Sequence, residues 1–272
     1  MRHEITAQPL VRKHIGKFLK LAGEEGWISS EEEILFFIRS YPEGCLSVVI
    51  DNAPVAFITS IRYRRTAWIG NLMVSAKYRG NGIGRMLMQT IIKLLDDSGC
   101  ETVWLTASSQ GAGLYRTLGF NEIDIIRRWI GNGRPEKQPG PNQPVDHAAM
   151  LDSLGWGDSR SELFAHKPDS FDWLIKSDGF LRHGAVNSST QVGPWIALSS
   201  MAASKLFSRF MNSCRGEGSI YLDSPEHNTS AANLLIKHNF SPAGSNLLMY
   251  RGTRPKYRPE LVYSLASMGS YG

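Results

Sequence analysis

Residues 71–84, Asn71-Leu72-Met73-Val74-Ser75-Ala76-Lys77-Tyr78-Arg79-Gly80-Asn81-Gly82-Ile83-Gly84, combine an apolar run, a glycine-rich turn and the start of a helix. The apolar residues from Trp68 to Val74 predict a strand, and apolar side chains recur at helical spacing from Ile83 onward. Glycines let main-chain N–H groups approach an anion closely, and the amino end of a helix adds partial positive charge. This stretch is therefore typical of a loop that binds phosphate groups.

Two familiar phosphate-binding loops do not fit the glycine pattern. A P-loop requires Lys and then Ser or Thr after its last glycine, whereas Arg85-Met86 follows here. The dinucleotide fingerprint G-x-G-x-x-G fails because its third glycine comes one residue early. The pattern that remains, R-x-x-G-x-G, lies between Asp51 and Asp96 in a stretch with seven Lys or Arg residues and no acidic residue. Such a stretch should attract a small phosphorylated ligand; a nucleic-acid groove would need a longer basic stripe or aromatic motifs.

Length and composition describe a globular protein. The 272 residues suggest two modest domains or one large one, and 42% hydrophobic with 20% charged residues argues against disorder. No apolar run approaches the roughly 18–20 residues that span a bilayer, and the first residues lead into no apolar signal core. The three isolated cysteines are typical of reduced thiols. We therefore expect a cytoplasmic protein without a membrane partner.

The first half alternates predicted strands and helices, which favours a mixed α/β sheet with helices packed on it. Ser29 and Ser30 each precede a glutamate by three residues, a pattern that predicts the start of a helix. The remaining elements are predicted strands at 45–50, 55–63 and 102–107, a short helix that ends at Gly119, and a strand from Phe120.

A linker and an internal repeat divide the chain. Residues 131–144 are rich in Gly and Pro and carry no large apolar side chain, which predicts a linker that begins in this region. Beyond it, Leu234-Leu235 followed by Asn239-Phe240 echoes Leu114-Tyr115 followed by Gly119-Phe120, and 192–197 echoes 69–74. Asn and Gly both tolerate left-handed backbone angles, so their exchange is mild. We interpret the halves as two copies of one fold.

The first half resembles the GNAT superfamily of acyl-CoA-dependent N-acyltransferases. The resemblance depends on the strand 71–74, the loop 78–84, Leu105-Thr106-Ala107 and the run 113–120 (GLYRTLGF), and it covers about residues 1–131. With 191–194 and 223–228, the chain is similar to tandem GNAT proteins whose second copy is divergent. The resemblance implies two GNAT-like domains, each with a mixed, largely antiparallel sheet flanked by helices, that form an internal pseudo-dimer. We expect a catalytic domain at 1–133, a linker at 134–147 and a domain without the pyrophosphate loop at 148–272.

The resemblance also implies an acetyl-CoA site. The amides that follow Arg79 through Gly84 would hold the pyrophosphate, strand groups of Leu72–Val74 would pair with the pantetheine arm, and an amide near Met73 would polarise the thioester carbonyl. Tyr115 takes the place of the usual general acid, because a phenol can protonate the departing thiolate. The expected coenzyme-binding residues are Leu72, Met73, Val74, Arg79, Gly80, Asn81, Gly82, Ile83, Gly84, Arg85, Thr106 and Ser108. Ser108 replaces an asparagine of many relatives, and no metal is expected.

The general base is not identified by the sequence. Glu24, Glu25 and Asp124 are candidates, although a surface carboxylate is the simpler interpretation of each, and the amine could lose its proton to water. In the second half, His183 and His227 could touch the substrate, and several aromatic residues could line a pocket or simply form the core: Trp156, Trp173, Trp195 and Tyr221.

The second copy lacks both the glycine loop and the tyrosine, whose place Leu235 takes. We therefore expect one catalytic site per chain, with the second half completing the acceptor pocket. The expected reaction moves an acetyl group from acetyl-CoA to a primary amine of a small molecule or peptide, directly within a ternary complex. A monomer or homodimer without a nucleic-acid partner is expected. The alternatives are a non-catalytic acyl-CoA-binding regulatory module and a transferase of a longer acyl group.

Overall fold

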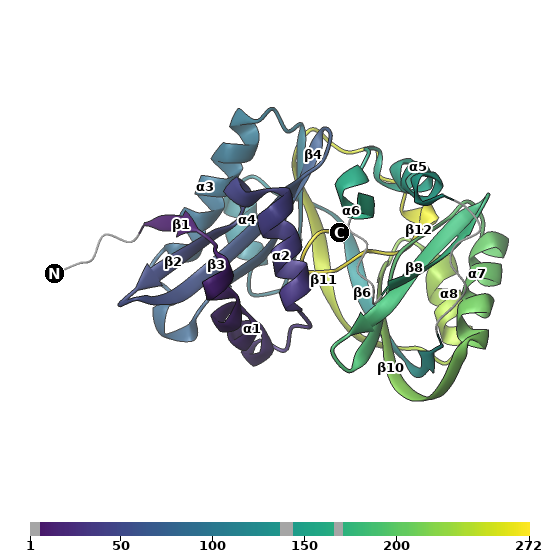
Figure 1. Ribbon diagram of the computed structural model, residues 1–272. Coiled ribbons are helices and arrows are strands. Elements are labelled where there is room, and N and C mark those ends of the chain that lie inside the picture. The colour runs from purple at the N-terminus through teal and green to yellow at the C-terminus, as the bar shows by residue number, and fades with distance from the viewer. Residues whose placement is uncertain (1–5, 137–143, 166–170) are drawn as a thin grey trace.

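A computed structural model describes residues 6–136, 144–165 and 171–272 (Figure 1). The strands form one sheet in the order β1-β2-β3-β4-β5-β11-β6-β10-β9-β8-β7, and β12 pairs with β9. Their bounds are β1 Ala7–Pro9, β2 Leu46–Ile50, β3 Ala53–Arg62, β4 Thr66–Val74, β5 Thr102–Ala107, β6 Asn121–Pro135, β7 Phe171–Lys176, β8 Gly179–Val186, β9 Ser189–Ala197, β10 Cys214–Pro225, β11 Ser241–Gly252 and β12 Val262–Ser264.

The helices lie on both faces of this sheet (Figure 1). Their bounds are α1 Ile15–Glu24, α2 Glu31–Ser40, α3 Ile83–Asp97, α4 Ala112–Thr117, α5 Val145–Trp156, α6 Ser161–Ala165, α7 Ser200–Asn212 and α8 Thr229–Lys237. The predicted start of α2 is confirmed, because the Ser30 hydroxyl accepts the Glu33 N–H at 3.2 Å. The predicted hairpin between β2 and β3 is confirmed as well, with Asp51 and Asn52 in left-handed conformations at its turn. Within the described residues, no helix has the length and apolar character needed to cross a membrane.

The two halves share strands at the centre of the sheet. β11, which comes from the second half, lies between β5 and β6 of the first half, and β6 in turn pairs with β10 of the second. Figure 1 shows β6 and β11 side by side in the middle of the molecule, with one lobe on either side. The repeat is visible here: α4 and α8 each end in a left-handed residue, Gly119 at φ 86° and Asn239 at φ 61°, before the central strand. The predicted pseudo-dimer is therefore confirmed, and the sharing of strands makes it one continuous sheet.

Three groups of buried apolar residues fill the space between sheet and helices. One lies under α3 and α4, and one lies under α7 and α8. The third is built by both halves, since it joins α1 and α2 with α5, α6 and the segment after β12. At its centre Trp68 and Trp104 of the first half meet Trp156 edge-on, with ring centroids 5.9 and 5.5 Å apart. The face of the first half that carries α2 is thus also the face that meets the second half.

The predicted linker is wrong at its beginning, because residues 131–135 belong to β6. The glycines there serve close packing: a Cβ on Gly131 would overlap the Phe240 ring, and Gly133 adopts φ +137°. At the other end of the predicted linker α5 begins at Val145, while residues 137–143 lie outside the described residues. The domain boundaries at 133 and 148 therefore stay a prediction.

Candidate functional site

The site begins where β4 and β5 separate. These parallel strands pair at 66–68 with 102–104, and their pairing ends there. Just beyond, the register between β3 and β4 shifts opposite Phe57–Thr59, which marks a bulge, and Asn71 within it has a left-handed φ of 55°. Asparagine tolerates this conformation better than other residues with a side chain. The bulge turns β4 away from β5 and leaves an opening between the two strands.

The glycine-rich turn after β4 offers a row of unpaired main-chain donors. Gly80 and Gly82 have φ values of +79° and +77°, and a Cβ at either position would meet nothing within 4 Å. These glycines are therefore required for backbone conformation and not for space. Within the described part of the chain, the N–H groups of residues 80–85 have no hydrogen-bond acceptor. Asn81 orders the turn, since its side-chain amide donates to the Tyr78 and Arg79 carbonyls at 3.2 Å.

This turn fits an anionic diphosphate. The first turn of α3 contains no acidic residue, and its N-cap is Gly82, which has no side chain to occupy the free N–H groups. Arg85 lies at the same end of α3 and donates to the Thr117 hydroxyl at 3.0 Å, which joins α3 to α4. Arg79 bends back instead: its Nε donates to the Val74 carbonyl at 2.9 Å, and its guanidinium pairs with Glu25. The predicted phosphate-binding residues thus lie together, with Arg79 across the end of β4.

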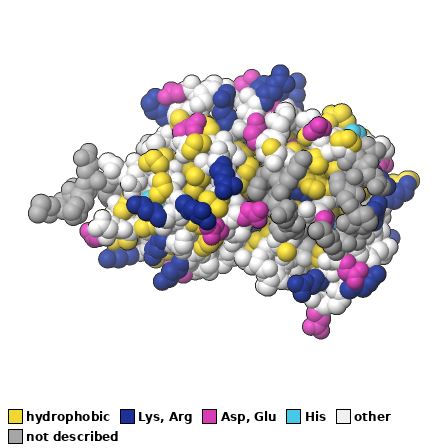
Figure 2. Space-filling view, viewed as in Figure 1, with side chains coloured by type: hydrophobic (Ala, Val, Ile, Leu, Met, Phe, Trp, Pro, Cys, Tyr) yellow, Lys and Arg dark blue, Asp and Glu magenta, His cyan; other side chains and the backbone are white. Residues whose placement is uncertain are grey.

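The basic stretch that surrounds the loop divides into two parts. Lys77, Arg79 and Arg85 flank the glycine turn, whereas Arg65 ties the first half to the second: its main-chain N–H donates to the Asp158 carboxylate at 2.9 Å. Figure 2 shows Lys and Arg side chains at separate positions on the visible face of the first half, with no continuous stripe there. Only part of the stretch is therefore available to a bound anion.

The β4 register determines which amides face the opening. The Ser75 N–H donates to the Val55 carbonyl, and Met73 pairs with Phe57 two residues earlier along the strand. Because main-chain groups alternate along an antiparallel ladder, Met73 faces β3 and Val74 faces the opening. The main-chain donor expected near Met73 is therefore better placed on a neighbouring residue of β4: Val74, or Leu72 in the bulge.

Tyr115 lies on the α4 side of the opening. Its ring is buried and meets Phe120 edge-on, with ring centroids 6.1 Å apart. Burial raises the pKa of Tyr115 to about 12, so the phenol stays protonated at neutral pH. Ser108 lies seven residues before it, ahead of α4, where its hydroxyl accepts the Gly111 N–H at 3.3 Å. The structure therefore holds a neutral phenol, capable of donating a proton, in the core that α3 and α4 form with β4 and β5.

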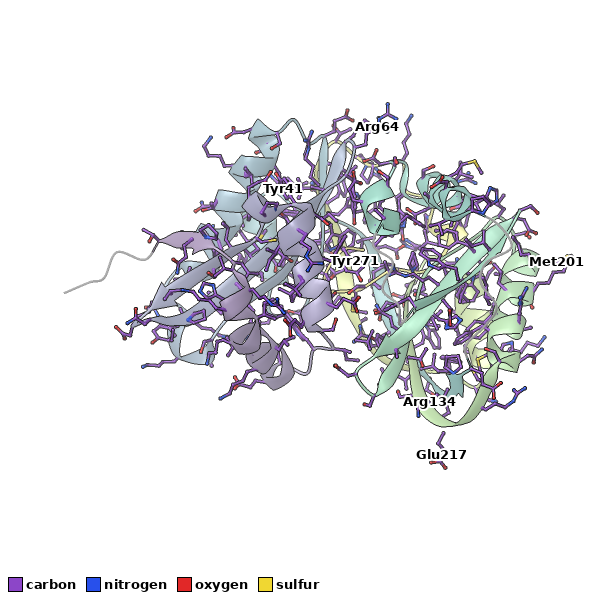
Figure 3. All side chains as sticks on the ribbon, in the orientation of Figure 1. Tyr41, Arg64, Arg134, Met201, Glu217 and Tyr271 are labelled. Carbon is purple, nitrogen blue, oxygen red and sulfur yellow. The ribbon has the colours of Figure 1, made fainter. Side chains whose placement is uncertain are left out.

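The segment after β12 enters the opening from the α2 face. The Asn71 N–H donates to the Gly269 carbonyl at 3.0 Å, and the Thr106 hydroxyl donates to the Met268 carbonyl. The Tyr63 hydroxyl donates to the Tyr271 carbonyl at 2.9 Å. Figure 3 shows Tyr271 between the two lobes. Thr106, predicted to contact the coenzyme, therefore holds this segment in the structure.

Glu33 is a half-buried carboxyl residue on the same face. Burial raises its pKa to about 7, although hydrogen bonds from the Ser270 side chain and the Ser30 main chain work in the opposite direction. The Ser270 hydroxyl also donates to the Asn71 side chain at 3.4 Å. The sequence identified Glu33 only as part of a helix start; its position beside the β4 bulge depends on the segment 269–271, far along the chain.

The base candidates from the sequence are not gathered at the opening. Glu25 pairs with Arg79, and Glu24 is an exposed residue at the end of α1. Asp124 is buried, accepts the Tyr257 hydroxyl at 3.2 Å and lies 3.2 Å from His227, which is a structural arrangement away from β4. His183 is buried against Phe210, and burial lowers its pKa to about 4. The four aromatic residues of the second half are buried: Trp156, Trp173, Trp195 and Tyr221.

The second half offers no equivalent cradle at α7. There the N-cap is Ser199, whose hydroxyl accepts the Ala202 N–H at 3.2 Å and thus occupies a donor that stays free at α3. Leu235, at the tyrosine position, is buried in the core. The groups that could bind an anion and donate a proton are combined in the first half of the described chain.

Comparison with known proteins agrees with this geometry. Residues 13–120 match the acetyltransferase (GNAT) family, and residues 148–264 match an acetyltransferase (GNAT) domain. The [ribosomal protein bS18]-alanine N-acetyltransferase of Haemophilus influenzae is 29% identical over 108 residues, which are 39% of this chain and 71% of that protein. The protein of the same name from Salmonella typhimurium is 32% identical over 87 residues, which are 31% of this chain and 59% of that protein.

Solved structures share the fold of the whole chain. A Pyrococcus horikoshii protein described as an acetyltransferase has a TM-score of 0.83 at 20% identity, and the match covers 100% of this chain and 97% of that one. A GCN5-related N-acetyltransferase from Sphaerobacter thermophilus has a TM-score of 0.62 at 14% identity, with 97% and 99% covered. The chain belongs to the GNAT family of acetyltransferases and carries two GNAT domains in tandem, the second of them divergent.

Proposed function

We propose that this protein transfers an acetyl group from acetyl-CoA to a primary amine of a small molecule or peptide, at one site in the first half. The observation that carries the proposal is the row of unpaired N–H groups at residues 80–85, next to the opening between β4 and β5. These donors lie at a helix N-terminus, where a pyrophosphate is stabilised both by hydrogen bonds and by the helix dipole. Acetyl-CoA supplies the thioester whose acetyl group is transferred.

Different residues of the opening would carry out the separate steps of a direct transfer. The amides of β4 that face the opening, at Val74 and in the bulge, would hold the pantetheine arm and polarise the thioester carbonyl. The amine, once deprotonated, forms the new C–N bond as the C–S bond breaks. Tyr115 would donate its proton to the departing sulfur and regain one from solvent. Overall the ammonium nitrogen loses two protons for each amide formed: one is released to solvent, and the other balances the proton that the CoA thiol has gained.

The acceptor side of this site is the α2 face, where the second half contributes. The Haemophilus influenzae and Salmonella typhimurium relatives of the first half are named for acetylating the alanine of a ribosomal protein, which makes a peptide amine one acceptor class to test. The segment 268–271 lies at this side of the opening, held by Thr106 and Asn71. An amine acceptor therefore meets groups of both halves.

The proposal is tested by binding and by turnover together. Titration calorimetry should show one acetyl-CoA site per chain, and a thiol-release assay with a panel of amines should show acetyl-CoA-dependent release of CoA. The double variant Arg79→Ala/Gly82→Ala should lose both signals. Acetyl-CoA binding that survives in this variant would place the coenzyme elsewhere, and binding without turnover on any amine would favour the non-catalytic acyl-CoA-binding module.

A further inference from the structure

A buried cation with free donors lies where the two halves meet. Arg182 in β8 is 1% exposed, and its Nε donates to the Gly193 carbonyl at 3.0 Å. Its two terminal nitrogens, Nη1 and Nη2, make no well-aligned hydrogen bond to the described residues; the Tyr271 hydroxyl is the polar group beside them. A guanidinium stays charged in proteins, and leaving charged donors unsatisfied in the interior is costly. A planar anion that accepts from both nitrogens is its natural complement.

Aromatic rings and residues of the first half surround the Arg182 guanidinium. The guanidinium carbon lies over the Phe171 and Trp173 rings, 4.8 and 5.5 Å from their centroids, so aromatic faces cover one side. Toward the first half it faces the Tyr271 side chain and Glu33, and the charges of Arg182 and Glu33 influence each other's pKa. No carboxylate of the described residues is hydrogen-bonded to the terminal nitrogens of Arg182. The buried guanidinium therefore has Tyr271 and Glu33 on the side of the first half, without a direct ion pair.

Three consecutive residues link Arg182 to the β4 bulge. Gly269 accepts the Asn71 N–H at 3.0 Å, the Ser270 hydroxyl lies between Glu33 and Asn71, and Tyr271 lies beside Arg182. The bulge and Arg182 therefore contact the two ends of one three-residue segment. An acceptor that touches both would take the place of the Ser270 and Tyr271 side chains.

We propose that the acceptor is an amine that carries a carboxylate, such as an amino acid, and that Arg182 binds this carboxylate. The inference rests on the proposed function and names the substrate class of the same site. The carboxylate replaces the Tyr271 phenol beside the guanidinium and accepts from Nη1 and Nη2. The amino group then lies toward β4, where the ionised form of the Glu33 carboxyl group has the opposite charge to an ammonium ion. The ligand thus matches a negative and a positive group, one from each half.

The experiment compares amino acids with the amines obtained by removing only their carboxylate, as acceptors for the full-length protein and acetyl-CoA. Hydrogen bonds between the carboxylate and the guanidinium stabilise the bound acceptor. We therefore expect kcat/KM to be roughly tenfold to a hundredfold higher for the carboxylate-bearing member of each pair. Equal rates, or a preference for the amine without a carboxylate, would overturn the inference and leave the proposed function intact. Acetyl-CoA binding without acetylation of any carboxylate-bearing amine would overturn it too.

Two variants assign the preference to Arg182. Arg182→Gln should reduce the ratio between paired acceptors to about one while acetyl-CoA affinity is unchanged, and Arg182→Lys should retain part of it, because a point charge replaces the bidentate fork. If Arg182→Gln fails to fold, the wild-type ratio and Arg182→Lys decide. A variant that loses stability but keeps the wild-type ratio would show that Arg182 only supports Tyr271. If the wild-type protein does not bind acetyl-CoA, the proposed function itself is refuted.

Discussion

The main-chain N–H of Asn71 donates to the carbonyl of Gly269 at 3.0 Å, which joins the bulge of β4 to a segment almost two hundred positions later in the chain. The bulge is the feature that opens β4 from β5, and the segment comes from the end of the second half. The acceptor side of the proposed site is therefore built from both halves. A substitution in the bulge should therefore displace the segment, and a substitution in the segment should displace the bulge.

Replacing Gly70 by alanine should displace this segment. A Cβ at Gly70 would overlap main-chain atoms of Gly269 and Ser270, which cannot rotate away as a side chain can. We expect a loss of about 1–3 kcal/mol in the free energy of unfolding, as is typical of overpacking. Because Gly272 packs on Trp68, the tryptophan fluorescence should change as well.

Gly113→Ala is the control for this change, since a Cβ there meets nothing within 4 Å. Denaturant unfolding of both variants, followed by fluorescence, measures the difference. Equal stability of Gly70→Ala and the wild-type protein would mean that the segment does not lie against β4 in solution.

Replacing Gly82 by alanine should weaken acetyl-CoA binding. The residue has φ +77° with open space around it, so the substitution costs about 1–2 kcal/mol of left-handed strain without a clash. The turn can relieve this strain only by rotating the free N–H groups away from the bound pyrophosphate. Calorimetry should show acetyl-CoA affinity reduced by roughly tenfold, since 1.4 kcal/mol corresponds to a factor of ten.

Gly99→Ala provides a matched control at the other end of α3. Gly99 also has a left-handed φ, +75°, and nothing within 4 Å of a Cβ. Its replacement should reduce stability by a similar amount and leave acetyl-CoA affinity unchanged. If both variants bind acetyl-CoA like the wild-type protein, the turn at 80–85 is not the binding site.

Replacing Tyr115 by phenylalanine should lower kcat by about a hundredfold, the lower part of the range for general acid catalysis. The ring keeps its packing against Phe120, so acetyl-CoA affinity and stability should stay near the wild-type values. Because the pKa of Tyr115 is raised to about 12, the shape of the pH profile below pH 9 should be the same with and without the hydroxyl group. Steady-state kinetics of thiol release checks both points.

Tyr263→Phe removes the same atom from a buried tyrosine of the second domain and should leave kcat unchanged. A Tyr115→Phe protein with full activity would show that water or another group protonates the thiolate.

Glu33 should make the protein less stable as the pH rises. Its pKa is about 7 in the folded protein against 4.5 for an ordinary carboxyl, mainly because burial disfavours the charged form. Between these values the folded state holds a proton that the unfolded state has lost. The free energy of unfolding is therefore higher at low pH, and it falls as the pH rises through 7. The stability of the wild-type protein relative to Glu33→Gln should thus fall by roughly 1–3 kcal/mol between pH 5 and pH 8.

Denaturant unfolding at the two pH values measures this difference. Glu32→Gln, at the exposed neighbouring position, should show no such change relative to the wild-type protein. A difference between wild type and Glu33→Gln that does not vary with pH would mean that the carboxyl group is solvated.

Much of the first domain follows from local sequence patterns. Alternating apolar residues fix β5 at 102–107, the Ser30–Glu33 spacing fixes the start of α2, and the glycines at 80 and 82 fix the turn before α3. These signals act over a few residues, so they can be interpreted without knowing the rest of the chain. The same reasoning misassigned residues 131–135, where glycine provides room for the ring of Phe240, which precedes β11.

The sequence by itself determined the glycine cradle and the place of Tyr115, because hydrogen-bonding and backbone requirements of neighbouring residues specify them. Only the tertiary structure decided that β11 lies between β5 and β6, and that Glu33, Asn71, Arg182 and the segment 269–271 meet. Those contacts join positions far apart in the chain, and their free energy comes from burying both halves against each other. No local pattern encodes such a contact, since each partner acquires its role only when the other is in place.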